Sequence, residues 1–225
     1  MFFKKKQDLI SSGSNDINSR VELTLLDARA TEKDVVSFCN IAYKNRYLGV
    51  VVFPCNVKIA KEYIGKKLDG ALKVIAAVDF PFGGATASTK IAEAKRCFQD
   101  GADEVDVTIN TGEILEERFN EIKSTISRIV RSSRGKVVKA VIETSYLNRE
   151  NLSKVIRCLL KTKVDFVMTN TGFGEGGATP EVVEIINAIC KNKCMVKASG
   201  GITNKAIAGD MIRMGAQRIG TSRVI

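Results

Sequence analysis

The chain has 225 residues, 44% of them hydrophobic, and this length is enough to bury one sizeable core. It contains no histidine, which excludes Ser-His-Asp and Cys-His catalytic groups and any metal site that needs imidazole. The formal net charge of +10 fits a phosphorylated ligand, an acidic partner or nucleic acid, and it equally fits an ordinary lysine-rich surface.

The sequence shows no secretory signal and no apolar run long enough to cross a bilayer. We therefore expect a cytoplasmic protein with no membrane partner. The six cysteines form no CxxC pair and lie mostly within apolar patterns, which favours buried thiols over disulfides. They are Cys39, Cys55, Cys97, Cys158, Cys190 and Cys194.

The first 20 residues open with Met-Phe-Phe-Lys-Lys-Lys and contain Ser11-Ser12-Gly13-Ser14. This composition predicts a flexible or loosely packed segment at 1–20, followed by a single domain at 21–225.

From residue 21 onward, extended and helical patterns alternate regularly. The predicted strands are Val21–Leu26, Gly49–Phe53, Leu72–Val78, Glu104–Ile109, Lys136–Ile142, Val164–Thr169, Cys194–Ala198 and Arg218–Thr221. The predicted helices begin near Thr31, Asn56, Ser88, Leu115, Asn148, Pro180 and Asn204, and Thr31 with Asp34 resembles a capping box. Eight strands and seven helices predict an α/β fold, a (β/α)8 TIM barrel lacking the final outer helix, with a doubly wound open sheet as the alternative.

In a barrel, the site lies at the carboxyl ends of the strands and uses inward-pointing side chains. The period-two alternation of Glu104 to Thr108 points Asp106 inward, and that of Met195 to Ser199 does the same for Lys197. Buried charges are expensive unless paired, so we predict an Asp106–Lys197 ion pair, with a purely structural role as the alternative reading. Further inward candidates are Glu22, Thr24, Thr108, Lys139 and Glu143.

An aspartate and a lysine enclosed together suit carbonyl chemistry. A lysine whose ammonium is disfavoured by burial and by a second cation can attack a carbonyl as a free amine, and the resulting iminium accepts electrons from the neighbouring carbon-carbon bond. Three glycine-containing loops after the last three strands offer backbone amides to an anion. They are Gly172–Gly177, Ser199–Gly201 and Gly220–Ser222.

Several motifs occur in the order in which one known family carries them. They are Asp79–Gly83, Gly101–Asn110, Lys139–Thr144, Thr169–Phe173, Val196–Ile202 and Arg218–Ser222, preceded by Glu22–Leu26 and Ala30–Asp34. Together they resemble deoxyribose-phosphate aldolase over nearly the whole chain from Val21.

The resemblance implies a barrel that cleaves 2-deoxy-D-ribose 5-phosphate into glyceraldehyde 3-phosphate and acetaldehyde through a lysine Schiff base, with no metal and no cofactor. It implies that Asp106 relays protons and that Lys197 is the second lysine, which lowers the pKa of the first. The expected partner is a small phosphorylated sugar, with a homodimer as an option and without nucleic acid. The residues expected at the substrate and its phosphate are Thr169, Gly172, Gly200, Gly201, Gly220 and Ser222.

The sequence departs from the family pattern at four positions. Met168 occupies the position of the Schiff-base lysine, and its thioether cannot form an imine. Glu22 replaces an aspartate and is kept as a candidate catalytic residue, Val51 replaces a frequent cysteine, and Arg223 replaces a small residue near the phosphate.

Three hypotheses follow. The first is an active aldolase in which Lys197, or alternatively Lys139, forms the imine. The second is a non-catalytic relative that still binds a phosphosugar. The third is a scaffold or interaction protein that uses the barrel surface.

Overall fold

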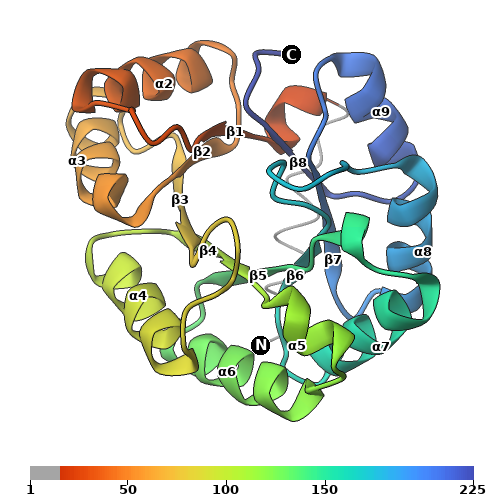
Figure 1. Ribbon diagram of the computed structural model, residues 1–225. Helices are drawn as coiled ribbons and strands as arrows, with labels where there is room; N and C mark the ends of the chain where they lie inside the picture. Colours follow the sequence, from red (N-terminus) through yellow and green to blue (C-terminus); the bar gives the residue numbers. More distant parts are fainter. Residues whose placement is uncertain (1–15) are drawn as a thin grey trace.

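The computed structural model describes residues 16–225, which form a closed barrel of eight parallel strands in sequence order with helices around it (Figure 1). The strands are β1 (Val21–Leu25), β2 (Gly49–Val52), β3 (Lys73–Val78), β4 (Glu104–Thr108), β5 (Val137–Val141), β6 (Phe166–Met168), β7 (Met195–Ser199) and β8 (Arg218–Thr221). Residues of β1 pair with β8, for example Leu23 with Thr221, and this closure excludes the open-sheet alternative.

The barrel wall is covered by helices that alternate with the strands along the chain. They are α2 (Glu32–Lys44), α3 (Val57–Lys67), α4 (Ala87–Gln99), α5 (Thr111–Leu115), α6 (Phe119–Ser132), α7 (Arg149–Leu160), α8 (Pro180–Cys190) and α9 (Lys205–Arg213). Short 3-10 helices span Ile17–Arg20, Pro54–Asn56 and Thr144–Tyr146. The predicted TIM barrel is confirmed.

Strand alternation divides the apolar side chains into two sets. Val105 and Val107 belong to the main core between the strands and the outer helices. Inside the barrel, two small apolar clusters flank the charged side chains. One consists of Val51, Ile75 and Ala77, and the other of Val137, Phe166 and Met195.

The observed helix starts agree with those predicted from the sequence for all but one helix. Thr31 and Asp34 form the predicted capping box, in which the Thr31 amide donates to Asp34 Oδ2 at 2.8 Å. The helix predicted from Leu115 is wrong, because α5 begins at Thr111 under a cap from Asn110 and α6 begins only at Phe119. Glu117, in a left-handed conformation with φ 55°, separates the two.

Within the described residues, no helix follows β8, as predicted. Ser222 to Ile225 instead return along the barrel to Tyr47, whose hydroxyl donates to the Ile225 carbonyl at 2.8 Å and accepts from the Ile225 amide at 2.9 Å. Residues 1–15 of the N-terminal segment lie outside the described residues, while Ile17–Arg20 pack beside α9. The division into a loose segment at 1–20 and a domain at 21–225 stays a prediction.

None of the six cysteines forms a disulfide, and five of them are buried, whereas Cys55 is exposed. Burial raises the pKa of Cys39 to about 11 and that of Cys97 to about 12, so these two thiols stay protonated. Across residues 16–225, none of the helices combines the length and apolar character needed to cross a membrane.

Candidate functional site

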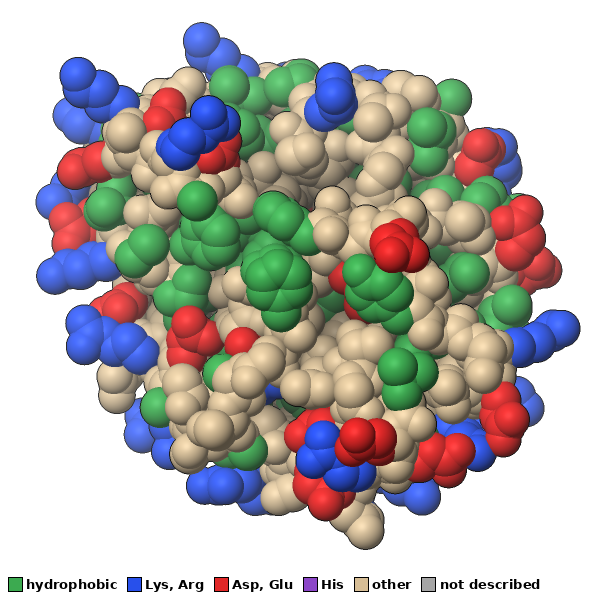
Figure 2. Space-filling view, in the orientation of Figure 1, with side chains coloured by type: hydrophobic (Ala, Val, Ile, Leu, Met, Phe, Trp, Pro, Cys, Tyr) green, Lys and Arg blue, Asp and Glu red, His purple; other side chains and the backbone are tan. Residues whose placement is uncertain are grey.

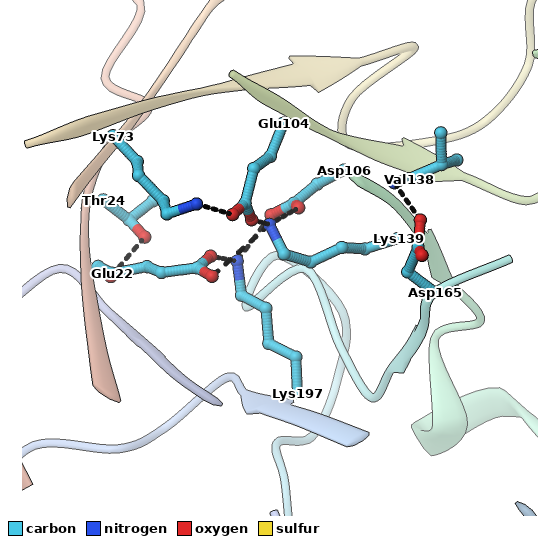
Figure 3. A network of polar contacts seen from close by, with 9 residues as sticks. All are labelled: Glu22, Thr24, Lys73, Glu104, Asp106, Val138, Lys139, Asp165 and Lys197. Carbon is cyan, nitrogen blue, oxygen red and sulfur yellow. Dashed lines mark hydrogen bonds and ion pairs between the residues drawn. The ribbon is translucent and has the colours of Figure 1, made fainter. Parts of the chain in front are cut away.

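The barrel interior holds a network of charged side chains drawn from β1, β4, β5 and β7, and Lys73 of β3 joins it (Figure 3). Lys197 on β7 donates to Asp106 Oδ2 on β4 at 2.5 Å and also to Glu22 on β1. The predicted Asp106–Lys197 pair is therefore present. Lys139 on β5 enters the same network, with its Nζ 2.9 Å from Asp106 Oδ1 and 3.3 Å from Glu22 Oε1.

Glu104 is a further member that the sequence analysis missed. Its Oε2 lies 2.7 Å from Lys139 Nζ, and its Oε1 lies 3.1 Å from Nζ of the partly exposed Lys73. The signal was available, since the alternation that turns Asp106 inward also turns Glu104 inward. Glu104 was overlooked because it opens the strand.

The electrostatics of the network keep Lys139, Glu104 and Asp106 charged at neutral pH. Burial opposes the charged form of Lys139, but the charges of Asp106, Glu104 and Glu22 outweigh it and raise the pKa of Lys139 above its usual value. Burial likewise opposes ionisation of Glu104, yet Lys139 and its other cationic neighbours lower the pKa of Glu104 to about 2. The pKa of Asp106 is lowered by Lys139 and Lys197 against its own burial. Lys139 is therefore an ammonium and not a free amine.

Met168 lies at the carboxyl end of β6 and is 4% exposed. In the barrel register it stands opposite Lys197 on β7 and opposite Val141 on β5, so its side chain shares the inward face with Lys197. Among residues 16–225, no group of three or more His, Cys, Asp or Glu side chains is arranged to hold a metal ion.

A cavity of about 910 Å³ opens at the carboxyl ends of β1, β6, β7 and β8. Five of the predicted ligand residues line it, namely Gly172, Gly200, Gly201, Gly220 and Ser222, and Thr24 joins them. The predicted Thr169 lies apart from this cavity. Its buried hydroxyl donates to the Ser199 carbonyl at 2.8 Å and accepts from the Ser199 amide at 3.0 Å, which ties β6 to β7.

Two of the glycines are required by geometry. Gly200 has φ 94°, a left-handed conformation that favours glycine. A Cβ on Gly220 would lie 2.7 Å from Ser199 Oγ and 3.0 Å from Lys197 Cε, so only glycine leaves room there for the lysine stem. The glycine at position 220 thus connects the cavity wall to the charged network.

Glu143 has a different role from the inward position proposed for it. It lies just after β5, is 4% exposed, and accepts hydrogen bonds from the loop after β6. Its carboxylate accepts from Asn170 Nδ2 at 2.8 Å, from the Thr171 amide at 3.0 Å and from Thr171 Oγ1 at 2.5 Å. Glu143 therefore fixes the loop that carries Gly172.

Three phenylalanine rings form a bridge at the barrel mouth that sequence analysis did not find. Phe80, after β3, packs edge-on against Phe173, after β6, with ring centroids 5.3 Å apart, and against Phe53, after β2, at 6.4 Å. Phe173 also lines the cavity and is 57% exposed. Figure 2 shows hydrophobic side chains gathered left of centre on this face, beside a hollow.

The closed barrel, its buried lysine–carboxylate network and the glycine-lined cavity define a TIM-barrel protein whose candidate ligand site is the cavity at the carboxyl ends of the strands. Comparison with known proteins supplies the family. A model of the DeoC/LacD family aldolases matches residues 20–222, and the chain belongs to this family.

Individual relatives agree with the family assignment. A deoxyribose-phosphate aldolase of Thermotoga petrophila is 41% identical over 224 residues, covering 98% of this chain and 88% of the relative. One from Thermococcus kodakarensis is 38% identical over 209 residues, covering 92% and 93%. The solved structure of the aldolase QR15 has a TM-score of 0.87 and 33% identity, covering 93% of this chain and 92% of the other. The resemblance seen in the sequence is thus confirmed.

Proposed function

We propose that this protein binds a phosphorylated deoxyaldose of the 2-deoxy-D-ribose 5-phosphate type and does not cleave it through a Schiff base at position 168. The ligand class follows from the family and from relatives named deoxyribose-phosphate aldolase. The absence of cleavage follows from the side chains that surround the inner end of the site.

The anion end of the proposed ligand belongs in the glycine-lined cavity. Of the described residues that line the cavity, one is basic, Arg29, and its guanidinium is paired with Asp27 at 2.9 Å. Backbone amides of the loops around Gly172 and Gly200, with the Ser222 hydroxyl, are therefore the groups we assign to the phosphate. A volume of about 910 Å³ is ample for a five-carbon phosphosugar.

One observation carries the proposal on catalysis: the inward position beside Lys197 holds a thioether, and Lys139 and Lys197, the two buried lysines of the charged network, are already ion-paired. A Schiff-base aldolase needs an uncharged amine next to the substrate carbonyl. Met168 has no amine, and the raised pKa of Lys139 keeps that side chain protonated. Lys197 is bound by Asp106 and Glu22 on β4 and β1.

A second candidate is aldol cleavage with Lys197 as the nucleophile. It is favoured by the position of Lys197, one strand from Met168 and in contact with Asp106, the carboxylate that would move the proton. Lys197 would first have to leave its two carboxylate partners, and the substrate would have to move toward β7.

The two candidates are separated by measuring binding and turnover on the same preparation. Calorimetric titration with 2-deoxyribose 5-phosphate should show saturable binding, unphosphorylated 2-deoxyribose should bind at least about tenfold more weakly, and acetaldehyde release should stay at background. Turnover that disappears in Lys197→Met would establish the second candidate. If the protein neither binds nor cleaves 2-deoxyribose 5-phosphate, both candidates are refuted and the scaffold hypothesis remains.

Paired glycine variants locate the binding. Gly220→Ala places a Cβ 2.7 Å from Ser199 Oγ and should weaken binding about tenfold or more, whereas Gly65→Ala in α3 meets no atom within 4 Å and should leave it unchanged. Equal affinities for both variants would show that the ligand does not occupy this cavity. The cytoplasmic location and the homodimer remain predictions, although a relative from Aeropyrum pernix, with a TM-score of 0.83 and 28% identity, is described as tetrameric.

A further inference from the structure

A second cavity, of about 770 Å³, lies between the C-terminal ends of α4 and α6 and the start of β5. The amino-terminal ends of the strands are at this side of the barrel, so the cavity is opposite the glycine-lined one. We call it the α4–α6 groove. Among residues 16–225, its lining includes five basic residues and no acidic one, and the basic residues are Lys95, Arg128, Arg131, Arg134 and Lys136.

Carboxylates of the described part of the chain do not compensate the positive charge of the α4–α6 groove. No ion pair joins any of its five cations to a carboxylate within residues 16–225. By contrast, Arg96, one residue from Lys95, pairs with Asp100 at 2.7 Å, and Lys154 on α7 pairs with Glu117 at 2.6 Å. The dipole of α6 explains a cation such as Arg131 in the last turn of the helix. It does not explain Arg134 and Lys136, because they lie beyond the end of the helix.

The turn at the end of the groove is held in place. The Ser133 hydroxyl lies 3.0 Å from both the Val130 and Lys136 carbonyls, and Arg134 adopts a left-handed conformation with φ 50°. Lys136 Nζ donates to the Ala102 carbonyl at 2.5 Å and lies 5.6 Å above the Phe98 ring. These contacts set the position of the Lys136 ammonium before any ligand binds, which lowers the entropic cost of binding.

We propose that the α4–α6 groove binds a compact polyanion with several adjacent phosphates. Its volume lies within the range of small-molecule sites, and closely spaced guanidinium groups suit neighbouring phosphates. Nucleic acid is the less suitable ligand, because the aromatic residue of the groove, Phe98, is half-buried with Lys136 over its ring and offers no open face for base stacking.

Inorganic tripolyphosphate is the probe for a calorimetric titration of the full chain. We expect saturable one-to-one binding that persists when 2-deoxyribose 5-phosphate is in excess. The double variant Arg128→Ala/Arg131→Ala should weaken tripolyphosphate binding at least about tenfold. The matched control is Arg149→Ala/Arg157→Ala, which removes the same two charges from exposed positions on α7 and should change the affinity less than about twofold.

Three results would overturn the proposal: no saturable binding, equal weakening by both double variants, or full competition by 2-deoxyribose 5-phosphate. A single-stranded oligonucleotide that binds more tightly than tripolyphosphate, with the same sensitivity to Arg128→Ala/Arg131→Ala, would overturn it in favour of nucleic acid. If Arg128→Ala/Arg131→Ala melts well below the parent protein, the same titration is repeated with two single variants of exposed side chains. Arg131→Glu then tests the groove, and Arg149→Glu is its control. Because the groove lies opposite the proposed sugar site, the two proposals fail separately.

Discussion

The change Met168→Lys tests whether the barrel lacks only the amine that would form a Schiff base. Met168 is the register partner of Lys197, so a lysine at this position enters the same enclosed space beside the Asp106 carboxylate. If the remaining site is intact, this one change supplies the missing amine. We expect the variant to form an imine with acetaldehyde and to cleave 2-deoxyribose 5-phosphate.

The size of the effect follows from the spacing of β6 and β7. Neighbouring strands are about 5 Å apart, and two ammonium groups at that distance repel by about 3 kcal/mol at an effective dielectric constant of about 20. This repulsion by itself lowers the pKa of the introduced lysine by about 2 units, from about 10.4 to about 8, while the Asp106 carboxylate acts in the opposite direction. At pH 7.5 the uncharged fraction would rise from about 0.1% to about a quarter, and burial would raise it further. A nucleophile contributes several orders of magnitude to the rate, so turnover should rise from background by about a thousandfold or more.

The assay is acetaldehyde release coupled to a dehydrogenase, together with borohydride trapping and peptide mass spectrometry. Met168→Gln, which is polar but has no amine, is the control for changes in packing. A Met168→Lys protein that folds and binds 2-deoxyribose 5-phosphate, yet gives neither adduct at position 168 nor turnover above the Met168→Gln control, would refute the reasoning.

Three further predictions concern the clamp on the β6 loop and the charged network. Glu143→Gln keeps the shape of the side chain but removes one of the two carboxylate oxygens that accept hydrogen bonds from the β6 loop. Calorimetry should therefore show binding of 2-deoxyribose 5-phosphate weakened about fivefold. An unchanged affinity would contradict the role of Glu143 in fixing this loop. Lys139→Met leaves three buried carboxylates with one fewer cation and should lower the free energy of unfolding in urea by about 3–5 kcal/mol, while Lys154→Met, on the surface, should lower it far less; similar losses would contradict the network. The pKa values of Glu104 and Asp106 are lowered in the folded protein, so their charged forms stabilise the fold at pH values above their unfolded pKa of about 4. This contribution is lost as the pH falls toward 2. Free energies of unfolding that stay constant from pH 5 to pH 3 would contradict the lowered pKa values.

Much of the fold was predictable because strand and helix periods are local properties of the sequence. The predicted strands overlap the observed ones, and they differ by at most two residues at either end. The break between α5 and α6 was missed because the apolar pattern continues across it. The local signal was the Asn110 side chain, which accepts from the Glu113 amide at 3.0 Å and starts α5 earlier than predicted.

The site was predictable to the extent that alternation and barrel closure determine it. Those rules placed Asp106, Lys197 and Glu22 in one enclosed space. They could not predict that Lys139 contacts the same carboxylates, since that depends on side-chain length and direction across the barrel. The phenylalanine bridge and the Glu143 clamp join loops far apart in the sequence, and such contacts leave no periodic pattern.

The most direct test of the central claim is the intact mass of the unmodified protein after incubation with acetaldehyde and borohydride. The account predicts no ethyl adduct on Lys197, although the same preparation binds 2-deoxyribose 5-phosphate saturably. A stable adduct of one reduced ethylidene group, mapped to Lys197 and suppressed by 2-deoxyribose 5-phosphate, would contradict it.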